Sequence, residues 1–87
     1  MTYKVALTQR AAKEADALGD EDHDRVLDAF DGLKLNPRPD GVRKLQGRDN
    51  DWRIRVGRFR IIYSVDDKEK LVIVRRVAHR KEAYRGL

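Results

Sequence analysis

Residues 51–65, DWRIRVGRFRIIYSV, constrain the fold of this chain of 87 residues more than any other segment. Apolar and charged side chains alternate on both sides of Gly57, a pattern typical of two half-buried strands joined by a tight turn. The pattern predicts an antiparallel pair with one apolar face and one arginine-bearing face. The apolar face would hold Trp52, Ile54, Val56, Phe59, Ile61, Tyr63 and Val65, and the other face Arg53, Arg55, Arg58, Arg60 and Ile62.

A strand and two helices are expected before this hairpin. Residues 3–8 alternate like a strand, and Thr8 can then cap a helix over residues 9–18, where alanines recur at helical spacing. A second helix should begin with Asp20 as its N-cap and an acidic first turn, which the helix dipole favours. It ends at residues 36–41, NPRPDG, because proline disfavours a helical conformation in the residue before it.

The rest of the chain is rich in strand patterns. Residues 42–46 (VRKLQ) are strand-like, and residues 71–77 are apolar at both parities, which predicts an interior strand covered on both faces. Short polar connections favour antiparallel neighbours. We therefore predict an α+β fold of order β-α-α-β-β-β, a helical hairpin packed on a mostly antiparallel four-stranded sheet, with a short C-terminal tail or helix.

Length and composition exclude several classes of protein. A chain of this size builds one small core, so residues 1–87 should form a single domain. There is no cysteine, and the two histidines lie far apart in sequence, so neither a metal site nor a cofactor is expected. No apolar run could span a bilayer and no signal peptide is visible, which predicts a cytoplasmic protein that does not contact membranes.

Positive charge is concentrated in the second half of the chain. Residues 1–42 carry six Lys and Arg against nine Asp and Glu, a balance of −3, and residues 43–87 carry fourteen against six, a balance of +8. Such a field attracts a phosphate-bearing ligand or an acidic protein. The arginines of residues 51–65 are then either a solvated outer face or an anion-binding surface. Their guanidinium groups, suited to bidentate contact with phosphate, favour the anion.

The tail AHRKEAYRGL follows the last strand and contains chemically useful side chains. It could be a basic terminus without a defined role. Alternatively, His79 could transfer a proton near neutral pH, Tyr84 could supply a hydroxyl group, and Arg80 could stabilise a phosphate. Arg60, inside an apolar strand, also requires an anionic partner or a wet site. Together these residues could perform acid–base chemistry on a phosphodiester.

Three motifs make the chain resemble a known family. They are NPRPDGVRKLQG at residues 36–47, WRIRVGRFRIIY at residues 52–63 and VAHRKEAYR at residues 77–85. Together they resemble the RelE/ParE superfamily of bacterial and archaeal toxins, on its RelE branch, over nearly the whole chain. The resemblance implies the RelE-like fold of the microbial-ribonuclease type.

The resemblance also implies a function. RelE-like toxins of type II toxin–antitoxin systems cleave mRNA, in many members at the ribosomal A site, without a metal ion. The ribose 2′-hydroxyl attacks the adjacent phosphate and leaves a 2′,3′-cyclic phosphate. The implied partners are mRNA and the ribosome, a RelB-like antitoxin in a heterodimer or heterotetramer, and operator DNA through the antitoxin.

The site residues follow from the same resemblance, with one departure. Arg53 and Arg55 stand where ribosome-dependent relatives have lysine, and arginine cannot deprotonate to act as a base. The base would then be His79, Tyr84 or ribosomal RNA. The predicted catalytic residues are Arg55, Arg60, His79, Arg80 and Tyr84, and the predicted RNA-binding residues are Lys44, Arg48, Arg53, Arg55 and Arg85.

Two other functions are compatible with the same fold. A ParE-like toxin would poison DNA gyrase and would have no catalytic site, and a degenerate toxin would survive only as a binding module. The presence of His79, Arg80 and Tyr84 favours the nuclease, whereas the replaced lysines favour the binding module.

Overall fold

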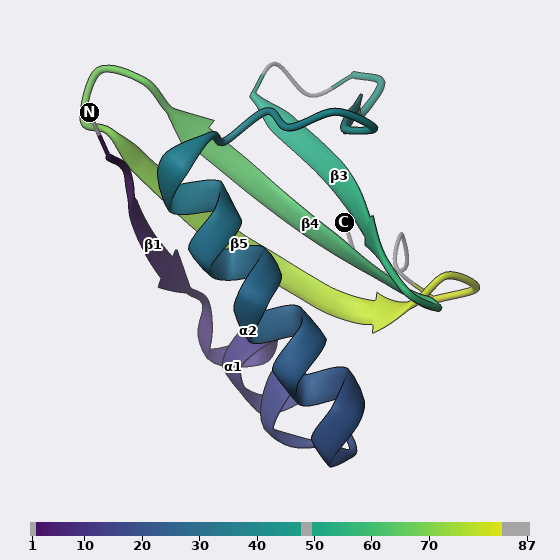
Figure 1. Ribbon diagram of the computed structural model, residues 1–87. Coiled ribbons are helices and arrows are strands. Elements are labelled where there is room, and N and C mark those ends of the chain that lie inside the picture. Colours follow the sequence, from purple (N-terminus) through teal and green to yellow (C-terminus); the bar gives the residue numbers. More distant parts are fainter. Residues whose placement is uncertain (1, 48–49, 83–87) are drawn as a thin grey trace.

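The computed structural model describes residues 2–47 and 50–82. Within these residues, the elements in chain order are β1 (Lys4–Leu7), α1 (Gln9–Asp16), α2 (Asp20–Leu35), β2 (Arg43–Lys44), β3 (Asp51–Val56), β4 (Phe59–Asp66) and β5 (Leu71–His79). The strands form one sheet in the order β1-β5-β4-β3-β2, and α2 lies across one of its faces (Figure 1). The predicted α+β class is confirmed.

The prediction of four strands was wrong by one strand. The part of the chain that the structure describes has a five-stranded sheet, because Arg43–Lys44 pairs with β3 as an antiparallel edge strand. Residues 42–46 were expected to be strand-like, but the predicted order of four strands left no place for them in the sheet. The sheet is mostly antiparallel, as expected, with β1 and β5 as its parallel pair. The doubly apolar β5 lies between β1 and β4, as its pattern predicted.

Both helices begin close to the predicted positions. The Thr8 side chain accepts a hydrogen bond from the Ala11 amide at 3.1 Å and so caps α1. The N-cap of α2 is Gly19 and not Asp20, which is instead the first of three acidic residues in the first turn. These carboxylates stabilise the helix through its dipole even though no side chain caps it. No helix among residues 2–47 and 50–82 is long and apolar enough to cross a membrane.

The core lies between α2 and the sheet. Val26, Phe30 and Leu33 of α2 are buried against β4 and β5, whose side chains on this face are also buried. Burying an aliphatic side chain of this size contributes about 1.5–3 kcal/mol. A smaller cluster on the opposite face consists of Ile62 and Ala78, with Leu45 packed against them. Most of the apolar burial is therefore on the helix side, and this leaves the other face available to polar groups.

Glu14 of α1 completes the edge of β5 where β1 ends. β1 pairs with β5 only as far as Val74, so no strand among residues 2–47 and 50–82 covers the next part of β5 on that side. The Glu14 carboxylate accepts a hydrogen bond from the Val77 amide at 3.0 Å and forms an ion pair with Arg76 at 3.0 Å. Arg76 is only 4% exposed. This contact joins α1 to the sheet.

A second polar cluster holds the loop after α2 against the turn between β4 and β5. Arg38 donates two hydrogen bonds to the Asp67 carboxylate, at 3.0 and 2.8 Å, and the Tyr3 hydroxyl donates a third at 2.7 Å. The hydrogen bond from Arg38, followed by that from Tyr3, lowers the pKa of Asp67 to about 2. The buried Tyr63 hydroxyl donates to the Pro37 carbonyl oxygen at 2.7 Å, which holds the same loop.

Removing Glu14 should destabilise the fold strongly. We expect Glu14→Ala to lower the free energy of unfolding by about 3 kcal/mol, because the buried Arg76 guanidinium loses its ion pair with Glu14 and the Val77 amide loses its hydrogen bond to the same carboxylate. Chemical denaturation would measure the change. The matched control is Glu21→Ala, which removes the exposed pair with Arg25 and should cost less than about 0.5 kcal/mol. Equal losses in the two variants would contradict the assigned role of Glu14.

The Asp67 cluster should make stability depend on pH in acid. The folded-state pKa of Asp67, about 2, lies below its ordinary value of 3.8, so its contribution is complete above about pH 4 and is lost as pH falls toward 2. We expect the stability difference between wild type and Asp67→Asn to be constant from about pH 7 to 5 and to shrink below about pH 4. Urea denaturation across this range would test it. A difference that stays constant down to about pH 2.5 would contradict it.

Candidate functional site

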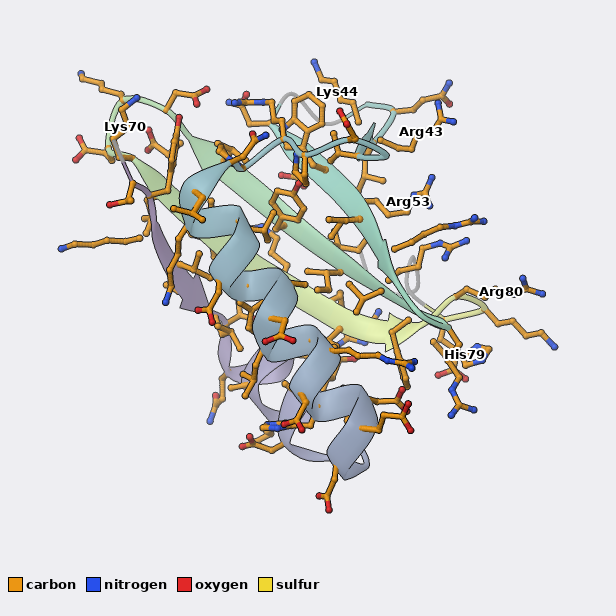
Figure 2. The ribbon with its side chains drawn as sticks, viewed as in Figure 1. Arg43, Lys44, Arg53, Lys70, His79 and Arg80 are labelled. Carbon is orange, nitrogen blue, oxygen red and sulfur yellow. The ribbon has the colours of Figure 1, made fainter. Side chains whose placement is uncertain are left out.

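Arginines face one another across the strands of the sheet. The register places Arg55 directly opposite Arg60, and Arg43 directly opposite Arg53. Like charges in directly opposite positions destabilise an antiparallel pair. Folding alone therefore does not explain this arrangement, which is instead suited to an anionic ligand. Figure 2 shows Arg43 and Arg53 projecting from the sheet near β2, and His79 and Arg80 at the far end of β5.

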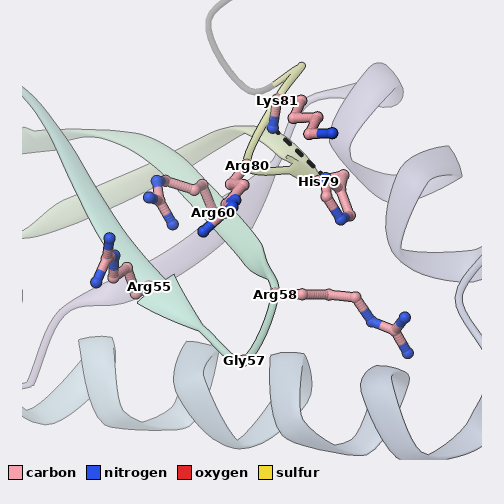
Figure 3. A pocket seen from close by; sticks show the side chains of 7 residues that line it. All are labelled: Arg55, Gly57, Arg58, Arg60, His79, Arg80 and Lys81. Carbon is pink, nitrogen blue, oxygen red and sulfur yellow. Dashed lines mark hydrogen bonds between the residues drawn. The ribbon is translucent and has the colours of Figure 1, made fainter.

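A basic hollow of about 380 Å³ lies at the end of the sheet where β3 turns into β4. Gly57 forms the turn with a φ of 60°, a left-handed conformation that glycine adopts without strain. Arg60, the second residue of β4, lies opposite Ala78 of β5. Seven residues line this first hollow: Arg55, Gly57, Arg58, Arg60, His79, Arg80 and Lys81 (Figure 3).

His79 is held in a defined orientation at the end of β5. Its ring packs edge-on against Phe59, with centroids 6.1 Å apart. Its Nδ1 atom accepts a long hydrogen bond of 3.5 Å from the Lys81 amide (Figure 3). We assign the proton of the neutral ring to Nε2, because Nδ1 acts as an acceptor. The neutral ring can therefore donate a hydrogen bond from Nε2 to a group in the first hollow.

A second hollow of about 310 Å³ lies beside the first and is lined by Gly41, Arg43, Arg53 and Arg55. Arg55 lines both hollows. The two hollows therefore form one basic track that runs from β2 across β3 to the end of β5.

The structure brings together most of the predicted site residues that it describes. Arg55, Arg60, His79 and Arg80 share the first hollow, and Arg53 lies in the second. Lys44 lines neither, since its ammonium group lies 6.0 Å from the centroid of the Trp52 ring. Three predicted residues, Arg48, Tyr84 and Arg85, lie outside the described residues.

Sequence reasoning missed three residues that line the track. Arg43 was missed because its short strand had no place in the predicted sheet, and Lys81 because no pattern set it apart from the other tail cations. Arg58 was expected only to keep the turn soluble. It lines the first hollow, but it points away from Arg55, and its guanidinium lies 3.5 Å from Asp22 (Figure 3). Residues 2–47 and 50–82 contain no group of three His, Asp or Glu side chains that could hold a metal ion.

Comparison with known proteins identifies the family. Residues 5–84 match the family model described as ParE toxin of type II toxin–antitoxin system, parDE. The chain belongs to the RelE/ParE family of toxins. It is a RelE-like member, because its relatives carry RelE names. A Methanocaldococcus jannaschii protein that carries the name RelE1 is 28% identical over 89 residues, which cover 99% of each chain.

Solved structures of RelE proteins have the same fold. The RelE–RelB complex of Pyrococcus horikoshii contains a chain that is 32% identical, with a TM-score of 0.83 over 95% of this chain and 100% of that one. In the RelBE2 toxin–antitoxin complex of Mycobacterium tuberculosis, the similar chain is 27% identical, with a TM-score of 0.80 over 92% of this chain and 100% of that one. Both relatives are described in complex with an antitoxin, and this toxin therefore has the fold of antitoxin-bound RelE proteins.

Repulsion between Arg43 and Arg53 should lower the free energy of unfolding of the toxin. We expect Arg53→Thr to raise the free energy of unfolding by about 0.2–1 kcal/mol, because it removes the charge opposite Arg43 and keeps a good strand former. The gain should shrink at high salt, which screens the repulsion. Lys4→Thr in β1 is the control, because Lys4 lies opposite the uncharged Leu71. Denaturation at low and high salt would measure both, and a destabilised Arg53→Thr would contradict the prediction.

Proposed function

We propose that this toxin is an mRNA endoribonuclease of a type II toxin–antitoxin system, which cleaves its substrate on the ribosome and so inhibits translation. The observation that carries the proposal is the first hollow, where Arg60 from the start of β4 comes together with His79 from the end of β5 and Arg80 directly after it. Two guanidinium groups beside a proton donor suit the cleavage of a phosphodiester. The substrate would place the toxin in the cytoplasm.

In the proposed reaction, the ribose 2′-hydroxyl attacks the neighbouring phosphorus, and the bond from phosphorus to the 5′-oxygen of the next nucleotide breaks. The products are a 2′,3′-cyclic phosphate and a free 5′-hydroxyl. Arg60 and Arg80 stabilise the charge that develops on the phosphate oxygens, each by about 3 kcal/mol. His79 in its imidazolium form donates a proton to the departing 5′-oxygen and is left as the neutral ring. The proton of the 2′-hydroxyl passes to a base, which arginine cannot provide and for which Tyr84 and ribosomal RNA are the candidates.

The proposed inhibitor of the toxin is a RelB-like antitoxin, in a heterodimer or a heterotetramer. The structures of the relatives from Pyrococcus horikoshii and Mycobacterium tuberculosis are of toxin–antitoxin complexes. The basic half of this chain, residues 43–87 with a balance of +8, would attract an acidic segment of such a partner. Contact with operator DNA would be made by the antitoxin.

A second candidate function is favoured by the family model itself, whose description names a ParE toxin. In this alternative the toxin poisons DNA gyrase, and the basic track is a surface for protein binding. A degenerate toxin that only binds its partners is the third possibility. Neither alternative requires a proton donor beside two arginines, and the RelE names of the relatives also support the nuclease.

The nuclease proposal predicts defined cuts in mRNA. Purified wild-type toxin in a translating extract should produce cuts in phase with the codons, mapped from the ends of the RNA fragments. Arg60→Gln and Arg80→Gln should each slow cleavage by about 100-fold, because each removes a cation that stabilises the transition state. His79→Gln should lose the part of the pH–rate profile that reports the proton donor.

Lys68→Gln is the matched control. It removes one positive charge from the exposed turn between β4 and β5, at the opposite end of β4 from Gly57, and should leave cleavage unchanged. Intact mRNA together with inhibited supercoiling by gyrase would overturn the nuclease in favour of the ParE-like function. If the toxin neither cleaves mRNA nor inhibits gyrase, the binding module is the function that is left.

A further inference from the structure

The second hollow contains cations that the proposed cleavage reaction does not use. Within residues 2–47 and 50–82, the side chains of Arg43, Arg53 and Arg55 make no hydrogen bond or ion pair with another residue. Arg43 and Arg53 face each other across the β2–β3 pair, and Figure 2 shows both projecting from that part of the sheet. An anion between them would remove the repulsion that their register creates.

The lining of this hollow indicates the chemistry of its ligand. It consists of three arginines and Gly41, with no apolar side chain. Gly41 has a φ of 86°, and apart from its chain neighbours no atom lies within 4 Å of the position that a Cβ would occupy, so the lining is open at Gly41. A peptide that needs to bury apolar side chains would find no partner here. A phosphate group, which the guanidinium fork binds through two hydrogen bonds, fits the lining.

Arg55 connects this hollow to the first. Arg53 and Arg55 are two residues apart on β3, so their Cα atoms are about 6.7 Å apart along the strand. Successive phosphates of an extended single strand have a comparable spacing. A strand whose phosphate lies beside Arg60 and Arg80 could therefore pass Arg55 and place its next phosphate between Arg43 and Arg53.

We propose that Arg43 and Arg53 form a second phosphate-binding site that holds the internucleotide phosphate next to the one in the first hollow. This inference rests on the proposed function and deepens it, because it makes the toxin bind at least two consecutive phosphates of a single-stranded RNA. Arg43 is then a binding residue on β2, although it does not contact the reacting phosphate.

Binding of short RNAs that resist cleavage would test the site. Fully 2′-O-methylated oligonucleotides lack the attacking hydroxyl group, so binding is measured without reaction. A fluorescent heptanucleotide serves as the probe, and an unlabelled dinucleotide with one phosphodiester or trinucleotide with two serves as the competitor. We expect Arg43→Gln to weaken the trinucleotide about fivefold at about 50 mM salt and to leave the dinucleotide unchanged. The slope of log affinity against log salt for the heptanucleotide should fall by about 0.7, the value for one lost contact to a single strand.

The controls separate this inference from the proposed function. Lys68→Gln removes one charge far from both hollows. It should change neither the affinity for the two competitors nor the salt slope. If wild type cleaves mRNA but Arg43→Gln changes neither the salt slope nor the affinity for the trinucleotide, the second site is overturned and the nuclease stands. Wild type that binds none of these RNAs would also overturn it, and the cleavage assay decides the nuclease separately. If Arg43→Gln weakens binding of a polyglutamate peptide and not of RNA, the hollow is a site for an acidic protein.

Discussion

The pairing of β4 with β5 supports the rest of this molecule. On the helix side, Ile61 and Val77 lie opposite each other and are buried beneath α2. At the end of the same pair of strands, Phe59 lies opposite His79 and Arg60 opposite Ala78. The first hollow is therefore built on strands that the core holds rigid, which is the condition for a site that must position several charged groups together.

The sheet has opposite roles on its two faces. The helix side supplies the favourable free energy of burial, and the cation-bearing side places two pairs of arginines in destabilising opposition. Local rules of stability are commonly broken at functional positions, and the rest of the fold compensates. Here part of the compensation comes from Glu14, which satisfies both Arg76 and the Val77 amide where β1 no longer reaches.

The sequence predicted the features that depend on local periodicity. Alternation around Gly57 separated the core residues of β3 and β4 from the arginines, and the doubly apolar pattern of β5 identified it as an interior strand. What it missed depends on long-range register. Arg43 is a candidate binding residue because it lies opposite Arg53, and only the pairing of the two-residue strand β2 with β3 reveals this position. The contact between Glu14 and Arg76 joins elements that no periodicity relates. Arg58 was also misjudged. Its place beside the turn suggested only a role in solubility, and the sequence did not reveal that it lines the first hollow.

The parallel pairing of β1 with β5 has a consequence for synthesis of the toxin. Among the strands of residues 2–47 and 50–82, β1 is made first and β5 last, yet β5 lies between β1 and β4 in the sheet. During translation, the nascent chain can form its helices and the β3–β4 hairpin, but β5, the strand that pairs with β1, is missing until residues 71–79 leave the ribosome. These same residues bring His79 to the hollow and are followed by Arg80. The order of the strands thus ties completion of the core and of the basic hollow to the synthesis of residues 71–79, so a nascent chain that has not reached them lacks both.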